Sequence, residues 1–151
     1  MLTWIEINKE NLFHNTAQFK KIAPQSQIWP VVKSNAYGHG LAEIVGLLDK
    51  DKNTTGFMVV NLSEALEVKK ISSKPVMVLS YFDRGEEELE IASKQEISLP
   101  VYDLDTIDYL DSLGQKFLVN IKIDTGTSRL GFLPEEGIEA VGYVQDKKNL
   151  I

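Results

Sequence analysis

A lysine followed by a polar, glycine-rich loop is the strongest candidate for chemistry in this sequence. A short apolar run ends in Lys33, and residues 34–40 read Ser-Asn-Ala-Tyr-Gly-His-Gly. A lysine that ends a buried strand is costly unless its charge is paired or its amine is used. An amine that attacks an aldehyde must be neutral, a form that burial favours. Tyr37 can donate a hydrogen bond to a phosphate, while Gly38 and Gly40 let backbone N–H groups approach an anion. The alternative is a solvated Lys33 at a strand end, with Tyr37 in ordinary packing.

A second group of polar residues lies near the end of the chain. Segment 117–124 alternates apolar and polar residues, so Asn120, Lys122 and Asp124 share one face of a strand. If helices cover the apolar face, the polar face is the inner one. Arg129 follows in a strand-to-helix loop, and its guanidinium suits a planar anion such as a carboxylate or a phenolate oxygen. The alternative is a structural Lys122–Asp124 ion pair with Arg129 on the surface.

Five apolar runs predict the strands that position these groups. They are residues 28–33, 56–61, 75–80, 97–102 and 117–124, and stretches with helical spacing lie between them. This alternation predicts parallel βαβ units, and therefore an α/β barrel or a doubly wound sheet. Pro100 weakens the fourth strand, because proline has no N–H to donate to a neighbouring strand.

The helical stretches also carry end signals. Asn8 and Ser63 are predicted N-caps, and Pro134 suits the first turn of the last helix. Leu12, Phe19 and Ile22 share one face of the first helix.

Composition excludes several classes of protein. The 151 residues carry a net charge of −6, which argues against a nucleic-acid binder. The sequence has no cysteine, so disulfides and thiolate metal sites are excluded, and we find no other metal-binding constellation. No signal peptide or membrane-spanning run is recognisable, so we expect a cytoplasmic protein that does not bind membranes.

The length conflicts with a closed barrel. A complete (β/α)8 barrel needs about 250 residues, and roughly five strands fit here. Residues 148–151 read as the opening of another strand. An open barrel leaves unpaired edges and an uncovered inner face. We therefore expect the chain to be a fragment, or one part of something larger.

The Lys33 segment resembles the pyridoxal 5'-phosphate attachment site of alanine racemases. Lys33 and residues 34–40 match the pattern Lys, small residue, Asn-Ala-Tyr-Gly-His-Gly. Related families such as diaminopimelate decarboxylases share the lysine and the asparagine but not the remainder. The resemblance implies that Lys33 forms the Schiff base with the cofactor and is the base on one of its faces. It also implies that Tyr37 contacts the phosphate; for Asn35 and His39 we expect loop-shaping roles.

The second polar group resembles another signature of the same family, Lys-hydrophobic-Asp-Thr-Gly-Met-x-Arg-Leu-Gly-Phe. Residues 122–132 fit it except at Thr127, where methionine is usual, which leaves the shape of the substrate pocket open. The resemblance makes Arg129 a catalytic residue that binds the cofactor's phenolic oxygen and the substrate carboxylate. Lys122 becomes a candidate for carbamylation that orients Arg129. By the same resemblance, Leu79 packs near the cofactor.

The resemblance extends, more weakly, over the whole chain, and it implies a fold and a function. The expected fold is α/β, a partial TIM-type (β/α)8 barrel with about five of its eight parallel strands and without a carboxyl-terminal β domain. Residues 1–151 would be the amino-terminal part of the barrel domain. The expected activity is interconversion of L-alanine and D-alanine, which supplies peptidoglycan synthesis, by a protein that is a homodimer when full length. In the family the second base is a tyrosine of the carboxyl-terminal domain, so we expect residues 1–151 alone to be inactive.

Three other functions stay open. One is a racemase of other or broader amino-acid specificity. Another is a non-catalytic module that binds pyridoxal phosphate through Lys33. The third is a barrel fragment that binds no cofactor and acts only in assembly.

Overall fold

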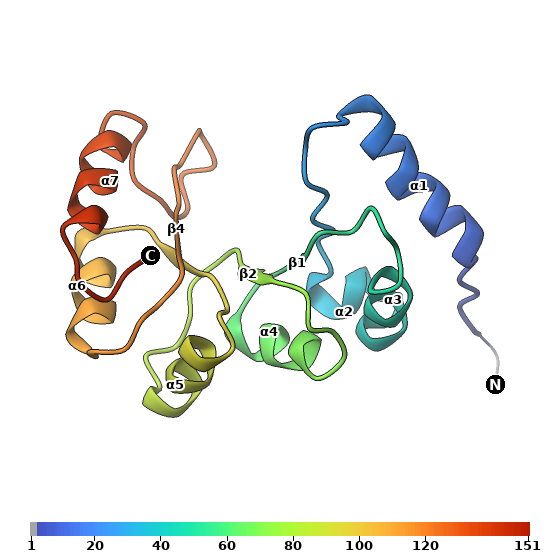
Figure 1. Ribbon diagram of the computed structural model, residues 1–151, viewed down its shortest axis with the longest axis horizontal. Helices are drawn as coiled ribbons and strands as arrows, with labels where there is room; N and C mark the ends of the chain where they lie inside the picture. The colour runs from blue at the N-terminus through green and yellow to red at the C-terminus, as the bar shows by residue number, and fades with distance from the viewer. Residues whose placement is uncertain (1–2) are drawn as a thin grey trace.

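Helices and short parallel strands alternate along the chain in this computed structural model, which describes residues 3–151. The order of elements is α1 (Lys9–Ile22), α2 (Lys33–Tyr37), α3 (Leu41–Leu48), β1 (Phe57–Val59), α4 (Leu62–Lys69), β2 (Val76–Val78), α5 (Glu86–Lys94), β3 (Leu99–Val101), α6 (Leu104–Ser112), β4 (Val119–Ile121) and α7 (Gly137–Gln145). In Figure 1 the strands lie in a row that runs from β1, beside α2, to β4, beside α7. The predicted α/β class with parallel strands is confirmed.

The strands pair in the order in which they occur in the sequence. β1 is parallel to β2, with Phe57 opposite Val76, and β3 is parallel to β4, with Leu99 opposite Val119. Single parallel bridges continue the row, joining Val31 to Met58, Met77 to Ser98 and Phe117 to Leu150. The last bridge agrees with the prediction that residues 148–151 begin a strand. Because parallel strands all run the same way, their carboxyl ends lie along one edge of the row.

Proline explains where the regular pairing stops. Ser98 donates to Val76 O and accepts from Val78 N, both at 2.9 Å, so even-numbered residues of this segment face β2. The next donor on that side would be Pro100, which has no N–H, and pairing with β2 ends there. On the other side Leu99 N donates to Leu118 O at 2.9 Å, so β3 still pairs with β4.

The prediction of a regular strand over residues 28–33 is wrong, again because of a proline. The structure has only isolated bridges in it, at Ile28 and Val31, and Lys33 already belongs to α2. Pro30 O accepts from Met58 N at 2.9 Å, and Val32 N donates to Met58 O at 2.8 Å. Pro30 faces β1 without a donor, so a continuous ladder cannot form.

The core lies between the strands and the helices packed on them. Phe57, Val59, Val76 and Val78 are buried, whereas Met58 and Met77 of the opposite face are half-buried. The buried faces of the helices complete it with Val45, Leu62, Ala65, Val68, Leu89, Ala92, Ile107 and Leu110. One face of the row is therefore covered by helices, and the other, inner face is more open.

Two predictions about the first helix have different outcomes. Asn8 caps α1, since its Oδ1 accepts from Asn11 N at 2.8 Å. Of the predicted apolar face of α1, Leu12 packs against the core, whereas Phe19 and Ile22 are 64% and 79% exposed; the buried residue of this helix is Thr16.

Two predicted helix starts are also shifted. Asn61, not Ser63, is the N-cap of α4, and Pro134 lies in the turn before α7 rather than in its first turn. Across residues 3–151 no helix has the length and apolar character needed to cross a membrane.

Candidate functional site

Lys33 begins one turn of left-handed helix. The four residues after it, Ser34, Asn35, Ala36 and Tyr37, all have φ between 51° and 55°. None is glycine, and an L-residue in this conformation costs roughly 1–2 kcal/mol because its Cβ crowds the backbone. The sequence predicted a loop after Lys33, but nothing in it indicated this handedness.

Backbone and side-chain hydrogen bonds close the turn. Ala36 N donates to Val32 O at 2.9 Å, and the Ala36 side chain is buried. His39 Nδ1 lies 2.9 Å from Ala36 O, and Asn35 Oδ1 accepts from Leu41 N at 2.8 Å, at the start of α3. These contacts match the loop-shaping roles expected for Asn35 and His39.

The side chains of Lys33 and Tyr37 are accessible. Lys33 is half-buried, and in the described part of the chain its ammonium has no hydrogen-bond or ion-pair partner. Tyr37 is 60% exposed, which contradicts the alternative that it serves ordinary packing. A half-buried amine without a partner and an exposed phenol four residues further along the chain are both available to bind a ligand.

Lys122 lies just beyond β4 and points across the row of strands. Its Nζ donates to Leu79 O, beyond the end of β2, at 3.0 Å. Asn120 Nδ2 likewise donates to Ser98 Oγ at 3.1 Å. The polar side chains of this segment therefore reach other strands across the inner face, as predicted.

The alternative of a Lys122–Asp124 ion pair is wrong, because Asp124 binds its own loop. Its Oδ1 accepts from Gly126 N at 2.9 Å and from Ser128 N at 3.1 Å, and its Oδ2 accepts from Arg129 N at 3.1 Å. These backbone donors, led by Gly126 and Ser128, lower the pKa of the Asp124 carboxyl below its usual value. The carboxylate is thus the organising group of the 124–132 loop.

Gly131 lets that loop close on the strand. Its φ is +131°, and a Cβ there would lie 2.7 Å from Asp124 N and 2.9 Å from Lys122 O. Phe132, which follows, is buried and forms a parallel bridge with Ile123. Arg129 is exposed, and within residues 3–151 its guanidinium has no hydrogen-bond or ion-pair partner.

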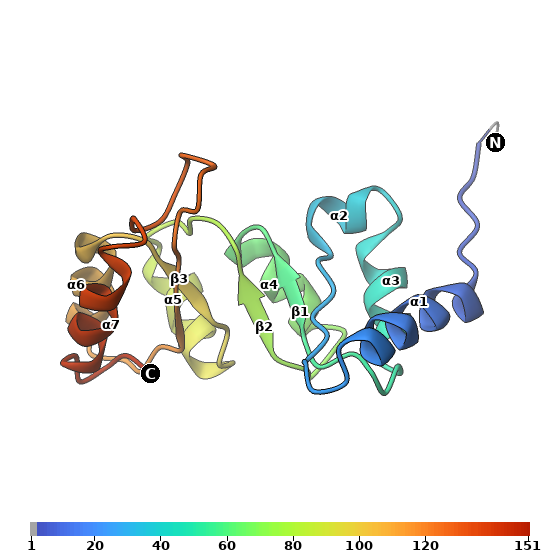
Figure 2. The same cartoon turned by 90° about the horizontal axis from the view of Figure 1, so that it is seen from above.

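The structure brings some of the predicted site residues together and leaves others apart. Leu79 and Lys122 are in direct contact through the 3.0 Å hydrogen bond. The turn after Lys33 and the 124–132 loop lie on the same side of the row of strands in Figure 2, with β1 and β2 between them. Among the described residues, no hydrogen bond links Lys33 to Arg129, although their loops lie on the same side of the row of strands.

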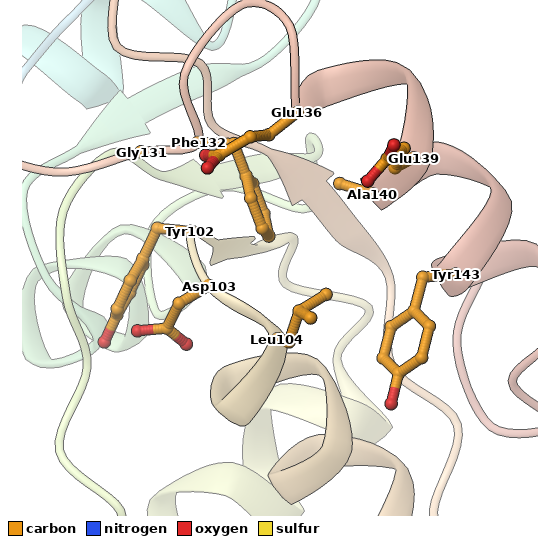
Figure 3. A pocket seen from close by; sticks show the side chains of 9 residues that line it. All are labelled: Tyr102, Asp103, Leu104, Gly131, Phe132, Glu136, Glu139, Ala140 and Tyr143. Atoms are coloured by element: carbon orange, nitrogen blue, oxygen red, sulfur yellow. The ribbon is translucent and has the colours of Figure 1, made fainter.

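A cavity of about 520 Å³ lies beside the 124–132 loop but contains none of the predicted site residues. Figure 3 shows the rings of Tyr102, Phe132 and Tyr143 around it, together with the carboxylates of Glu136 and Glu139. In the same described part of the chain, no group of three His, Cys, Asp or Glu side chains is placed to hold a metal ion.

Comparison with known proteins decides the family. Residues 7–151 match the family model described as the alanine racemase, N-terminal domain. The chain belongs to this family. An alanine racemase of Fusobacterium nucleatum is 36% identical over 152 residues, which cover 100% of this chain and 42% of that racemase.

Solved structures of racemases share the fold. The alanine racemase of Clostridium difficile 630 is 33% identical and superposes with a TM-score of 0.85, over 99% of this chain and 40% of that one. A histidine racemase from Leuconostoc mesenteroides is 27% identical, with a TM-score of 0.84 over 95% and 39% of the two chains. The chain therefore spans about two fifths of the length of the racemases it matches.

Sequence reasoning missed one residue that reaches the Lys33 turn. Glu64 Oε1 accepts from Ser34 N at 2.7 Å, and its Oε2 accepts from Val60 N at 3.0 Å. A signal was present, because a glutamate three residues after the cap Asn61 is typical of a capping box. That pattern predicts a bond within α4 and gives no indication of Ser34, which lies 30 residues away.

Proposed function

We propose that this chain supplies the cofactor-attachment part of a pyridoxal 5'-phosphate-dependent alanine racemase, which interconverts L-alanine and D-alanine. Residues 1–151 would be the amino-terminal part of a TIM-type (β/α)8 barrel domain. The observation that carries the proposal is Lys33: a half-buried ammonium without a partner, on a left-handed turn, in a chain of this family.

The residues of the site fit this cofactor. Lys33 would attach to the aldehyde, since no carboxylate in the described part of the chain competes for its amine. The exposed Tyr37 has a hydroxyl that can donate to the phosphate. Leu79 would pack near the ring, and Arg129 would bind the phenolic oxygen; both lie on segments joined by the Lys122–Leu79 hydrogen bond.

Each side chain would then have a distinct part in racemisation. When bound, pyridoxal phosphate supplies the electron sink that makes the α-proton of an amino acid removable. The neutral Lys33 amine would remove or return that proton on one face. The Arg129 guanidinium would hold the substrate carboxylate, for which its planar fork is suited. A second base, from outside residues 3–151, would act on the opposite face.

Lys122 would orient Arg129 as a carbamate. The atom that would be carbamylated, Lys122 Nζ, lies on the inner face and donates to one protein acceptor, Leu79 O. Carbamylation would turn a cation into an anion, and an anion attracts the Arg129 guanidinium. A carbon dioxide adduct on Lys122, seen in intact protein and reversed by acid, would be the direct test.

A second candidate is a racemase of other or broader specificity. Two observations support this candidate. The chain is similar to the structure of a histidine racemase, and Thr127 stands where methionine is usual in the signature. Profiling the whole protein against alanine, serine and histidine separates the two, because an alanine racemase shows its highest kcat/KM with alanine.

The whole protein would act as a homodimer in the cytoplasm and feed D-alanine to peptidoglycan synthesis. The activity is tested by incubating it with L-alanine and pyridoxal phosphate in deuterated water. Racemisation predicts D-alanine that carries deuterium at the α-carbon, and loss of both signals in Lys33→Ala. A module that binds the cofactor without catalysis would bind it through Lys33 and yet leave the α-proton unexchanged.

A further inference from the structure

The left-handed turn after Lys33 needs something to hold it. Within residues 3–151, only Glu96 and Ser128 are further non-glycine residues with positive φ, and each stands alone. Four such residues occur in succession, from Ser34 to Tyr37, so the backbone strain of the left-handed conformation adds up along the turn. Backbone strain of this kind persists only when the surrounding structure fixes it.

Glu64 is placed to do this. It lies in the first turn of α4, and its own N–H donates to the cap Asn61 Oδ1 at 2.9 Å, which fixes its backbone. A glutamate at this position usually returns to the N–H of the cap residue. Here its two oxygens instead bind Ser34 N at 2.7 Å and Val60 N at 3.0 Å.

The bond to Ser34 acts on Lys33 directly. The Ser34 N–H belongs to the peptide group that joins Lys33 to Ser34, so fixing this group fixes the orientation of the Lys33 backbone. A hydrogen bond to a charged acceptor is stronger than one between neutral groups, so this bond can offset part of the backbone strain of the turn.

The bond to Val60 extends the support to the next two strands. Val60 follows β1, and Ser80 N donates to Val60 O at 3.1 Å, beyond the end of β2. Leu79 is its neighbour, and Leu79 O accepts from Lys122. Glu64 therefore connects the Lys33 turn to the edge of the fold that carries Leu79 and Lys122.

We propose that Glu64 is a positioning residue for Lys33: its carboxylate bridges Ser34 N and Val60 N and so holds the left-handed turn that aims the amine. This inference rests on the proposed function in one respect, that Lys33 is the attachment residue. Glu64 itself touches neither the cofactor nor the substrate in this proposal.

The test compares Glu64→Ala and Glu64→Gln with Glu67→Ala in the full chain. Glu67 is a matched control, because it lies on the same helix, is exposed, and pairs with Lys70. Without cofactor, Glu64→Ala is expected to lower the hydrogen-exchange protection of the Ser34 and Val60 amides about tenfold or more. Glu64→Gln keeps one acceptor oxygen, so it should restore protection at one of the two amides. Glu67→Ala should leave both unchanged.

A second readout uses pyridoxal phosphate itself. The rate at which borohydride fixes it on the Lys33 peptide should fall about tenfold in Glu64→Ala, and recover in part in Glu64→Gln. Unchanged amide protection and unchanged trapping in Glu64→Ala would overturn the proposal. If Glu64→Ala does not fold, Glu64→Gln decides, and full protection of both amides in it counts against the bridge.

The two proposals fail in different ways. If the Ser34 amide loses protection but the wild-type chain attaches no cofactor at Lys33, the proposed function is wrong and the bridge stands. If the wild-type chain attaches cofactor at Lys33 and Glu64→Ala attaches it at the same rate, the positioning role is wrong and the proposed function stands.

Discussion

The loop after Lys33 and the loop that carries Arg129 project from the same edge of the fold, yet a carboxylate holds each in a different way (Figure 2). Asp124 binds the backbone N–H groups of residues two, four and five positions further along its own loop. Glu64 reaches the Lys33 turn from another βα unit, 30 residues away in sequence.

The two loops at this edge of the fold therefore depend on different parts of the chain for their shape. The 124–132 loop carries its own organising group, so it can order as soon as its strand forms. The Lys33 turn needs β1 and α4 in place, because its partner stands in the first turn of that helix. Closing a contact between distant residues costs more chain entropy than closing a local one.

The largest effect is expected at Gly131, which the self-contained loop needs to close. Gly131→Ala should lower the free energy of unfolding by about 3 kcal/mol. The added Cβ would clash with backbone atoms, and alanine is strained at the positive φ of this position. Gly126→Ala, also at positive φ (+129°) but in open space, should cost about 1 kcal/mol. Urea unfolding of both variants measures this; equal losses would show that the close approach at Gly131 is unimportant.

Asp124→Ala should separate the two loops. The Gly126, Ser128 and Arg129 amides lose their acceptor, so their hydrogen-exchange protection should fall together. The Ser34 amide should keep its protection, because its acceptor belongs to Glu64. A loss of protection at Ser34 in this variant would mean that the two loops are coupled and that Asp124 also supports the Lys33 turn.

Acid should loosen the 124–132 loop through the same carboxylate. Its hydrogen bonds lower the pKa of Asp124 in the folded chain below the unfolded value of about 3.9. The stabilisation is therefore complete above about pH 4 and is lost as the pH falls through the lower, folded-state pKa. The Gly126 and Ser128 amide NMR shifts should titrate with a midpoint below 3.9. A midpoint above 4.5, or the same titration in Asp124→Asn, would contradict this.

The smallest changes in stability are expected where glycine replaces a residue that has a left-handed backbone conformation. Ser34→Gly and Ser128→Gly should each stabilise the chain by about 0.5 kcal/mol, the relief of strain less the entropy that glycine loses on folding. Thermal unfolding measures both. Destabilisation by Ser34→Gly alone would show that the Ser34 side chain contributes more than its backbone conformation.

The sequence predicted features that depend on residues close together along the chain, and it did not predict those that depend on distant residues. Alternating apolar runs predicted the parallel strands, and the 122–132 signature pointed to a loop whose organising carboxylate lies within the motif itself. The prediction of a regular strand over residues 28–33 is wrong because Pro30 has no N–H to donate on the side that faces β1. The exposure of Phe19 and Ile22 could not be predicted either, since helical periodicity identifies a face but not what covers it.

The hydrogen bonds from Ser34 N and Val60 N to Glu64 could not be predicted from the sequence for a related reason. A motif records residues that are neighbours along the chain, and this contact forms only after β1 and α4 have folded beside the Lys33 turn. The handedness of that turn is likewise set by its surroundings, because none of its four residues prefers it.

The central claim is that Lys33 is the attachment residue for pyridoxal phosphate. Its most direct test is to mix the purified chain with the cofactor, reduce with borohydride, and locate the added mass by peptide mass spectrometry. We expect a single labelled site at Lys33, which Lys33→Ala abolishes and Lys122→Ala retains. Labelling that persists in Lys33→Ala at the wild-type level, or that falls mainly on other lysines, would contradict it.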